Sequence, residues 1–292
     1  MSSGIDRPGL RVYNLPTMPH SLNLRPTAVL AAVAGAIAVA ALSTMTGAQG
    51  PAQGIPRFAD GRVNLSGIWQ ANNTANWDVL THQARQGPMT ALGAAFSVPG
   101  GLGVVEGNEI PYKPDARAKK EQNAGNWLTA DPEIKCFLPG VPRATYMPYP
   151  FQIVQGGAST DMLITYEFAS ASRIVRMNTN VESPVDTWMG WSRGRWDGDT
   201  LVVDVTAFNG ESWFDRAGNY QTASLHVVER YTPVARDVLQ YEATIEDAQI
   251  YTRPWKISMP LYRRLEKHAQ LVEYKCVEFA EEVMYGHLVK GR

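Results

Sequence analysis

The sequence predicts an all-β protein of mainly antiparallel strands, closed into a barrel or a related sandwich. The C-terminal half is a succession of short segments rich in β-branched and aromatic residues, with apolar residues that alternate or run together. Eight Trp and twelve Tyr accompany 25 Gly and 19 Pro, a composition typical of strands and turns. Long helical patterns between the segments are missing, which argues against a parallel α/β sheet. Closure of the sheet is the natural way to hide so many strand edges.

The strands are expected in chain order, joined by short turns. An Asp-Gly pair at 197–198 predicts a tight hairpin turn. Residues 114–122 read as one short helix, with Pro and an acid at the start and bases later. Prolines at 132, 139, 142, 148 and 150 predict a rigid, irregular loop. The expected strands are residues 63–69, 151–154, 161–168, 172–177, 201–208, 225–231, 238–247, 256–264 and 270–279.

The N-terminal segment predicts export. Residues 28–42 are uncharged and apolar, follow Arg25, and precede small residues that fit a cleavage site after Ala48. This apolar stretch is shorter than the roughly 20 residues that a membrane-spanning helix needs. We therefore expect residues 1–48 to be a signal peptide, residues 49–292 to form one β-rich domain, and the protein to be periplasmic or secreted, without a stable membrane anchor after cleavage. An uncleaved anchor is the alternative.

Length, charge and cysteine content limit the classes of protein to which this chain can belong. The chain has 292 residues, of which 45% are hydrophobic and 19% charged, so one domain can bury a substantial core. The formal net charge is -1 and no basic run occurs, which argues against a nucleic-acid partner. Cys136 and Cys276 are the only cysteines, and an oxidising compartment favours a disulfide between them. Two separate buried thiols are the alternative.

Four long segments resemble a family of exported bacterial hypothetical proteins. They are CFLPGVPRATYMPYPFQI, GRWDGDTLVVDVTAFNGESWFDRAGNY, LHVVERYT and TIEDAQIYTRPWKISMPLYRR, and the similarity covers essentially the whole mature chain. The resemblance implies membership of that family but no activity. Gly67-Ile68-Trp69 also resembles the Gly-x-Trp on the first strand of lipocalin-like (calycin) barrels, which implies a barrel with a ligand cavity. The mature chain is longer than a simple lipocalin, and the Pro-rich loop has no counterpart there.

Strand alternation places three ionisable groups among apolar side chains. In 225–231, Glu229 shares its face with Leu225, Val227 and Tyr231. Asp247 ends the apolar face of 238–247, and Arg253 has the same parity as Trp255 in the next segment. A buried carboxylate is either paired or functional. An ion pair of Arg253 with Glu229 or Asp247 is one interpretation, and a cavity acid that exchanges a proton with a ligand is the other.

The segment 212–220 is a candidate ligand-binding loop, because loops at the mouth of a rigid barrel commonly contact ligands. Trp213 and Phe214 would stack on a ring, while Asp215 or Arg216 orients its polar end. A surface turn whose aromatic residues pack on the barrel rim is the alternative. Arg143 and Tyr146 of the Pro-rich loop are further candidate ligand contacts, as are Arg253 and Trp255.

His226 is the one histidine inside a strong strand pattern and is a candidate general acid–base group. A structural strand histidine is the alternative reading. The sequence contains no Gly-x-Ser-x-Gly, no Gly-rich phosphate-binding motif and no metal-ligand spacing, so we expect no cofactor and no metal.

Three function classes follow. The first is an exported binder of a small, partly apolar molecule inside the barrel, which a barrel filled by its own side chains would exclude. The second is a cofactor-independent lyase, isomerase or hydrolase in which Glu229 or Asp247 moves a proton with His226 or Asp215 as partner. The third is a structural envelope protein, which would expose a large apolar patch instead of a pocket.

Overall fold

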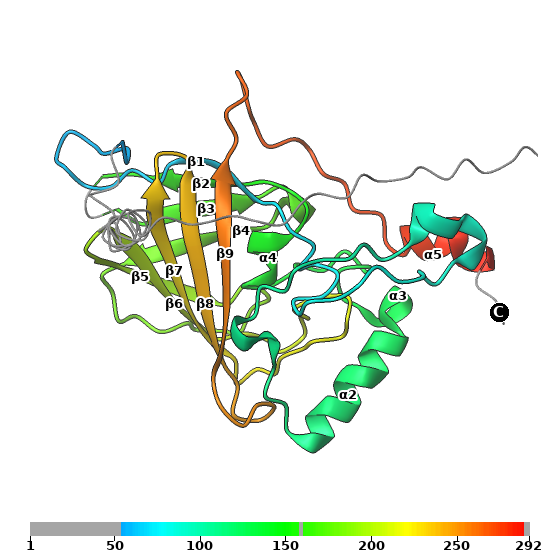
Figure 1. Ribbon diagram of the computed structural model, residues 1–292. Helices are drawn as coiled ribbons and strands as arrows, with labels where there is room; N and C mark the ends of the chain where they lie inside the picture. Colours follow the sequence, from blue (N-terminus) through cyan, green and yellow to red (C-terminus); the bar gives the residue numbers. More distant parts are fainter. Residues whose placement is uncertain (1–53, 158–159, 289–292) are drawn as a thin grey trace, which may run out of the picture. The chain divides into compact units, whose positions relative to one another are not determined.

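The computed structural model describes residues 54–157 and 160–288, all of which belong to one unit that spans residues 51–292. In these residues nine strands form a closed barrel in which the spatial order equals the chain order (Figure 1). The predicted all-β barrel is therefore confirmed. The strands are β1 (Gly67–Ala71), β2 (Phe151–Gln155), β3 (Met162–Tyr166), β4 (Ser172–Met177), β5 (Trp191–Asp197), β6 (Thr200–Thr206), β7 (His226–Ala235), β8 (Val238–Glu246) and β9 (Trp255–Arg263).

Neighbouring strands are antiparallel except at one seam. The first and last strands pair through Trp69 and Arg263, which closes the barrel. β4 and β5 are parallel, and their ladder joins only residues 175–177 to residues 192–194. A parallel connection needs a long crossover, and residues 178–190 supply it without a helix. This short seam leaves the start of β4 without a partner on the β5 side.

Most predicted strands form, with four differences, one of which is that β5 has no counterpart among the expected strands. The first strand begins at Gly67 rather than at residue 63, and residues 270–279 contain no strand. The hairpin between β5 and β6 turns at residues 198–199, because Asp197 pairs with Thr200 and still belongs to the ladder. Gly198 takes φ 58°, the positive value that a tight two-residue turn requires.

Helices lie beside the barrel. The predicted helix is α2 (Pro114–Gly125), and α3 (Trp127–Ala130) follows it directly. The Pro-rich segment contains a single helical turn, α4 (Arg143–Tyr146), and α5 (Ala280–Tyr285) lies toward the C-terminal end of the described residues (Figure 1). Four 3-10 segments complete the described helices: η1 (Thr90–Phe96), η2 (Glu106–Asn108), η3 (Phe168–Ser170) and η4 (Gly286–Leu288).

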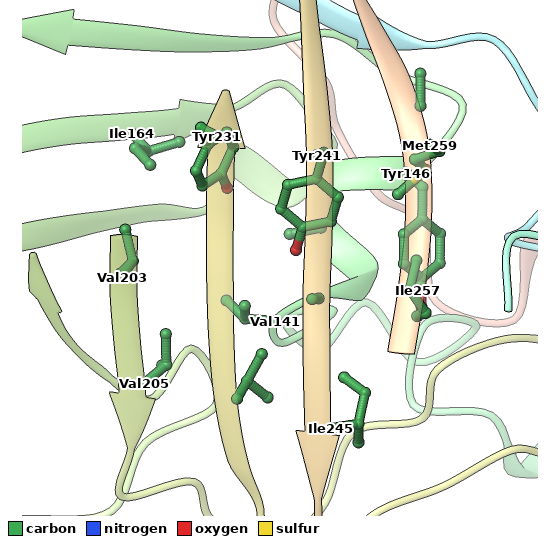
Figure 2. Packing of buried hydrophobic residues seen from close by; sticks show 14 of the residues in the cluster. Val141, Tyr146, Ile164, Val203, Val205, Tyr231, Tyr241, Ile245, Ile257 and Met259 are labelled. Atoms are coloured by element: carbon green, nitrogen blue, oxygen red, sulfur yellow. The ribbon is translucent and has the colours of Figure 1, made fainter. Parts of the chain in front are cut away.

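The protein's own side chains occupy the barrel interior. Alternate residues of β7, β8 and β9 are buried, as the sequence pattern predicts. Val141 and Tyr146 of the Pro-rich segment pack against them and belong to the same apolar cluster (Figure 2). Burial of this kind contributes about 25 cal/mol per Å² of apolar surface, so the filled interior is the main source of stability. A ligand site has to lie elsewhere.

The Pro-rich segment is also tied to the C-terminal region. Cys136 and Cys276 form a disulfide with Cα atoms 5.6 Å apart, as predicted. The predicted signal peptide lies outside the described residues. Among the helices of residues 54–157 and 160–288, none has the length and apolar character that crossing a membrane requires.

Candidate functional site

The ionisable group predicted inside the barrel is present, with an unexpected partner. Glu229 is fully buried on β7, and Arg173 of β4 faces it across the interior. The guanidinium donates to both carboxylate oxygens, at 2.6 Å to Oε2 and 3.0 Å to Oε1. Such a two-point contact is the strongest form of an arginine–carboxylate pair. The pair joins two strands that are not neighbours in the sheet.

Hydroxyl groups complete this interior cluster. Tyr231 and Tyr241 donate to Glu229 at 2.9 and 2.8 Å. The remaining N–H groups of Arg173 donate to Tyr166 at 3.0 Å, Tyr231 at 3.0 Å and the Ser192 hydroxyl at 3.2 Å. All five donors of the guanidinium are thus used. The buried ion pair is therefore satisfied by protein groups alone.

Charge states in the cluster follow from its surroundings. Burial, and then the negative charge of Glu229, raise the pKa of both Tyr231 and Tyr241 well above the ordinary value. Burial alone would lower the pKa of Arg173, but the Glu229 carboxylate outweighs it and raises the pKa. Both tyrosines stay protonated and the arginine stays charged at neutral pH. The cluster holds β4 and β7 in position relative to each other. A catalytic role for Glu229 stays a prediction.

A pocket of about 640 Å³ lies where β4 and β5 separate, and we call it the wall pocket. Its volume is within the range of about 300 to 1,000 Å³ that small-molecule sites occupy. Ser172, Arg173 and Ile174 pair with β3 but not with β5, so the wall of the barrel is interrupted here. The lining residues are Leu138, Ser172, Arg173, Ile174, Arg176, Asp186, Thr187, Trp188, Met189, Gly190, Trp191, Ser192 and Asn209.

The wall pocket combines apolar walls with free hydrogen-bond donors. Ser192 accepts a hydrogen bond from Arg173, and its own hydroxyl hydrogen has no acceptor in residues 54–157 and 160–288. Asn209 uses its side-chain oxygen to accept from the Glu211 amide, while its N–H₂ group has no partner in the same ranges. Arg176 stacks on Trp191, 4.5 Å from the ring centroid. The pocket can therefore hold an apolar molecule that offers acceptor oxygens.

A second buried polar group connects the loops outside the barrel. Arg143 is 1% exposed and pairs with Asp131 through two bonds of 2.8 and 2.9 Å. Arg216 pairs with Glu133 at 2.8 Å and lies over the rings of both Trp77 and Trp127. Arg143 and Arg216, both predicted as ligand contacts, are thus engaged with carboxylates of the Pro-rich segment.

Of the predicted ligand-binding loop, Trp213 and Tyr220 line a pocket. Phe214 is 2% exposed and packs edge-on against Trp255, which is itself buried. Tyr146 is buried as well, and its hydroxyl donates to the Phe214 carbonyl at 2.8 Å. Phe214, Trp255 and Tyr146 were expected to contact a ligand. Their rings are instead buried in the core and are not accessible from the surface.

Asp215 is a predicted site residue whose acidity is perturbed by burial. It is completely buried and accepts hydrogen bonds from the Val79 amide at 2.9 Å and from the side chain of Asn219 at 2.6 Å. Burial, and next the negative charge of Asp78, raise its pKa to about 7 from the ordinary 3.8. The carboxyl is therefore partly protonated at neutral pH.

This pKa predicts a pH effect on stability. Between pH 3.8 and about 7 the folded protein keeps a proton on Asp215 that the unfolded chain has released. Protonation of Asp215 therefore raises the free energy of unfolding in acid, and this stabilisation is lost as the pH rises toward about 7. A ¹³C NMR titration of the Asp215 carboxyl is expected to have its midpoint near pH 7. Asp78→Asn should lower that midpoint. A midpoint near the ordinary value in the folded protein would contradict the assignment.

The ion pair expected for Arg253 is wrong. Arg253 lies in the turn before β9, is exposed, and donates only to the neighbouring Pro254 carbonyl at 3.5 Å. Asp247 follows β8 and accepts from the Thr222 amide at 2.8 Å and from its hydroxyl at 2.9 Å. Both residues lie beyond the strand ends, where alternation no longer decides which way a side chain points.

His226 lies on the outer face of β7 and is not near Glu229. Its ring nitrogens contact Asp204 at 2.9 Å and Glu246 at 3.3 Å. Burial alone would lower the pKa of His226, but the hydrogen bond and charge of Asp204 outweigh it and raise the pKa. The structure thus separates Glu229, Asp247, Asp215 and His226, so no pair of the predicted acid–base groups converges on one pocket.

Comparison with known proteins adds no relative. No family model, no curated protein and no solved structure matches this chain. The function is therefore inferred from the chemistry of the pockets. Arg173, Ser192 and Ile174 were missed in the sequence, although alternation in 172–177 places Arg173 on the same face as Val175 and Met177.

Proposed function

We propose that this protein is exported and binds a small, partly apolar molecule without net charge in the wall pocket. The interrupted β4–β5 seam carries the proposal, because it opens a pocket of about 640 Å³ in a barrel whose interior is filled. The N-terminal apolar segment and the family resemblance support export. A disulfide between Cys136 and Cys276 is also typical of proteins that fold in oxidising compartments.

The lining supports a ring-containing molecule with acceptor oxygens. Trp188, Trp191 and Ile174 supply flat apolar surface. Ser192 and Asn209 supply donors, which would bind a carbonyl or ether oxygen. Both arginines of the lining have carboxylate partners, because Arg173 pairs with Glu229 and Arg176 pairs with Asp161 at 3.5 Å. A ligand without net charge is therefore favoured over an ion.

The neutral naphthalene ketone prodan is a suitable probe for this pocket. Ile174→Glu is expected to weaken prodan binding at least tenfold, because it places a charge in an apolar wall while Ile174, 49% exposed, contributes little to the core. Ser192→Ala should weaken binding about fivefold, the value of one hydrogen bond of about 1 kcal/mol. Fluorescence titration of prodan measures both changes.

Leu163→Glu is the matched control. Leu163 pairs with Ile174 across the β3–β4 ladder and is 38% exposed, but it does not line the pocket. Prodan affinity should be unchanged in this variant. Equal losses in the two glutamate variants, or no saturable binding to the wild-type protein, would refute the wall pocket as the ligand site.

A further inference from the structure

A second pocket of about 480 Å³ lies outside the barrel, and we call it the α2 pocket. Four parts of the chain line it: α2 and α3, the Pro-rich segment, Trp188 of the β4–β5 crossover, and the segment from Gly210 to Gln221. It shares only Trp188 with the wall pocket. The chemistry of its lining is different, since it has two lysines and four aromatic rings but no leucine or isoleucine.

Two lysines give the α2 pocket a positive character. Lys135 is half-buried, and its ammonium group has no carboxylate partner in the described ranges 54–157 and 160–288. Among the residues that the structure describes, Lys119 has one polar contact, with the side-chain oxygen of Gln122 at 3.4 Å. Glu211 is the one carboxylate in the lining, so positive charge is in excess. An unpaired, half-buried ammonium group favours an anionic ligand.

Aromatic rings surround these cations. Trp213 and Tyr220 belong to the lining. So does a stacked pair, Phe137 and Trp188, whose ring centroids are 4.8 Å apart and whose planes are nearly parallel, at 9°. Flat rings of this kind favour a planar aromatic ligand, which stacks on them with an offset or meets them edge to face.

Gln221 provides an independent sign of a missing partner. It is 4% exposed and lines the α2 pocket. Its Nε2 donates to the Ser212 hydroxyl, but its Oε1 is buried and accepts no hydrogen bond from any described residue. An unpaired buried acceptor is unfavourable, and a ligand hydroxyl seated in the pocket would satisfy it.

We infer that the α2 pocket binds an aromatic carboxylic acid that carries a hydroxyl group. The carboxylate contacts Lys135 and Lys119, the ring packs among Trp213, Tyr220 and the Phe137–Trp188 pair, and the hydroxyl donates to Gln221. This site is distinct from the wall pocket and takes a different class of ligand, so it goes beyond the proposed function.

The covalent structure supports the geometry of this site. Lys135 and Phe137 are the two neighbours of Cys136, whose disulfide to Cys276 anchors the Pro-rich segment. One bond thereby holds both the cation and an aromatic wall in place. A binding site built in this way needs no rearrangement to receive its ligand, which lowers the cost of binding.

Three related compounds test the inference: 4-hydroxycinnamate, its methyl ester, and cinnamate. Calorimetric titration should show the hydroxy acid binding about tenfold more tightly than the ester, which lacks the charge, and about fivefold more tightly than cinnamate, which lacks the hydroxyl. Lys135→Gln should remove the preference for the acid over the ester while leaving ester binding unchanged. Gln221→Leu should remove only the preference for the hydroxyl.

Lys120→Gln is the control for net charge, since Lys120 is on α2 but does not line the pocket. It should leave all three affinities unchanged. The inference is overturned if the acid binds no more tightly than the ester, or if Lys120→Gln and Lys135→Gln act equally. Prodan binding should be unaffected by Lys135→Gln, so failure here is distinguishable from failure of the wall pocket.

Discussion

Glu229→Ala is expected to lower the free energy of unfolding by about 3–5 kcal/mol, because Arg173 would become an unpaired buried cation. The side chains of this pair are 2% and 0% exposed. Tyr231 and Tyr241 would also lose their acceptor. Urea denaturation followed by tryptophan fluorescence measures the change.

Two controls separate the buried pair from charge removal in general. Arg173→Met combined with Glu229→Leu removes both charges and should recover much of the loss, since apolar replacement of a complete buried pair is often close to neutral. Arg230→Ala breaks a surface pair with Asp197, whose side chains are 38% and 57% exposed, and should cost less than about 1 kcal/mol. If Glu229→Ala is no more destabilising than Arg230→Ala, the cluster does not hold the barrel together.

Sequence alone predicted half of this ion pair. Alternation in β7 placed Glu229 among apolar side chains, and the structure confirms that position. Its partner was not identifiable, because Arg173 is 56 residues away on a strand that does not neighbour β7 in the sheet. Alternation reveals which face a residue occupies, but not which residues meet across a closed barrel.

Predictions failed where the strand pattern was extended past a strand end. Arg253 has the parity of a buried residue, yet it lies exposed in the turn that connects β8 to β9. Asp247, in the same turn, is buried as predicted, but it accepts hydrogen bonds from Thr222 instead of pairing with Arg253. The segment 212–220 shows a related limit. Its composition indicated a ligand loop, but the Pro-rich segment and residues 75–79 cover Phe214 and Asp215, and only the fold brings these segments together.

Both pockets depend on contacts between segments that are far apart in the sequence. The wall pocket exists because a short parallel seam interrupts the barrel, and no local pattern in 172–177 or 191–197 predicts which strands pair in parallel. The α2 pocket combines residues from positions 119, 135, 188 and 213. Local sequence therefore predicted the barrel, whereas the sites arise from long-range contacts.

Removal of the disulfide is expected to have the second large effect on stability. In Cys136→Ser/Cys276→Ser the free energy of unfolding should fall by about 2–5 kcal/mol, because the cross-link restricts a long loop of the unfolded chain. The two cysteines are separated by 140 positions, which places the expected loss toward the upper part of that range. The wild-type protein reduced with dithiothreitol should give the same denaturation midpoint as the double variant.

The same variant distinguishes a local effect from a general one. Without the bond, the C-terminal segment is still held by the packing of Tyr274 on Tyr149 and Phe168, so the barrel should remain folded in the absence of denaturant. Prodan should then bind as before, while 4-hydroxycinnamate binds more weakly because Lys135 and Phe137 are no longer fixed. An unchanged free energy of unfolding would mean that non-covalent contacts are enough to anchor the segment. An equal fall in the affinities for prodan and 4-hydroxycinnamate would indicate that the structure of the whole barrel had changed.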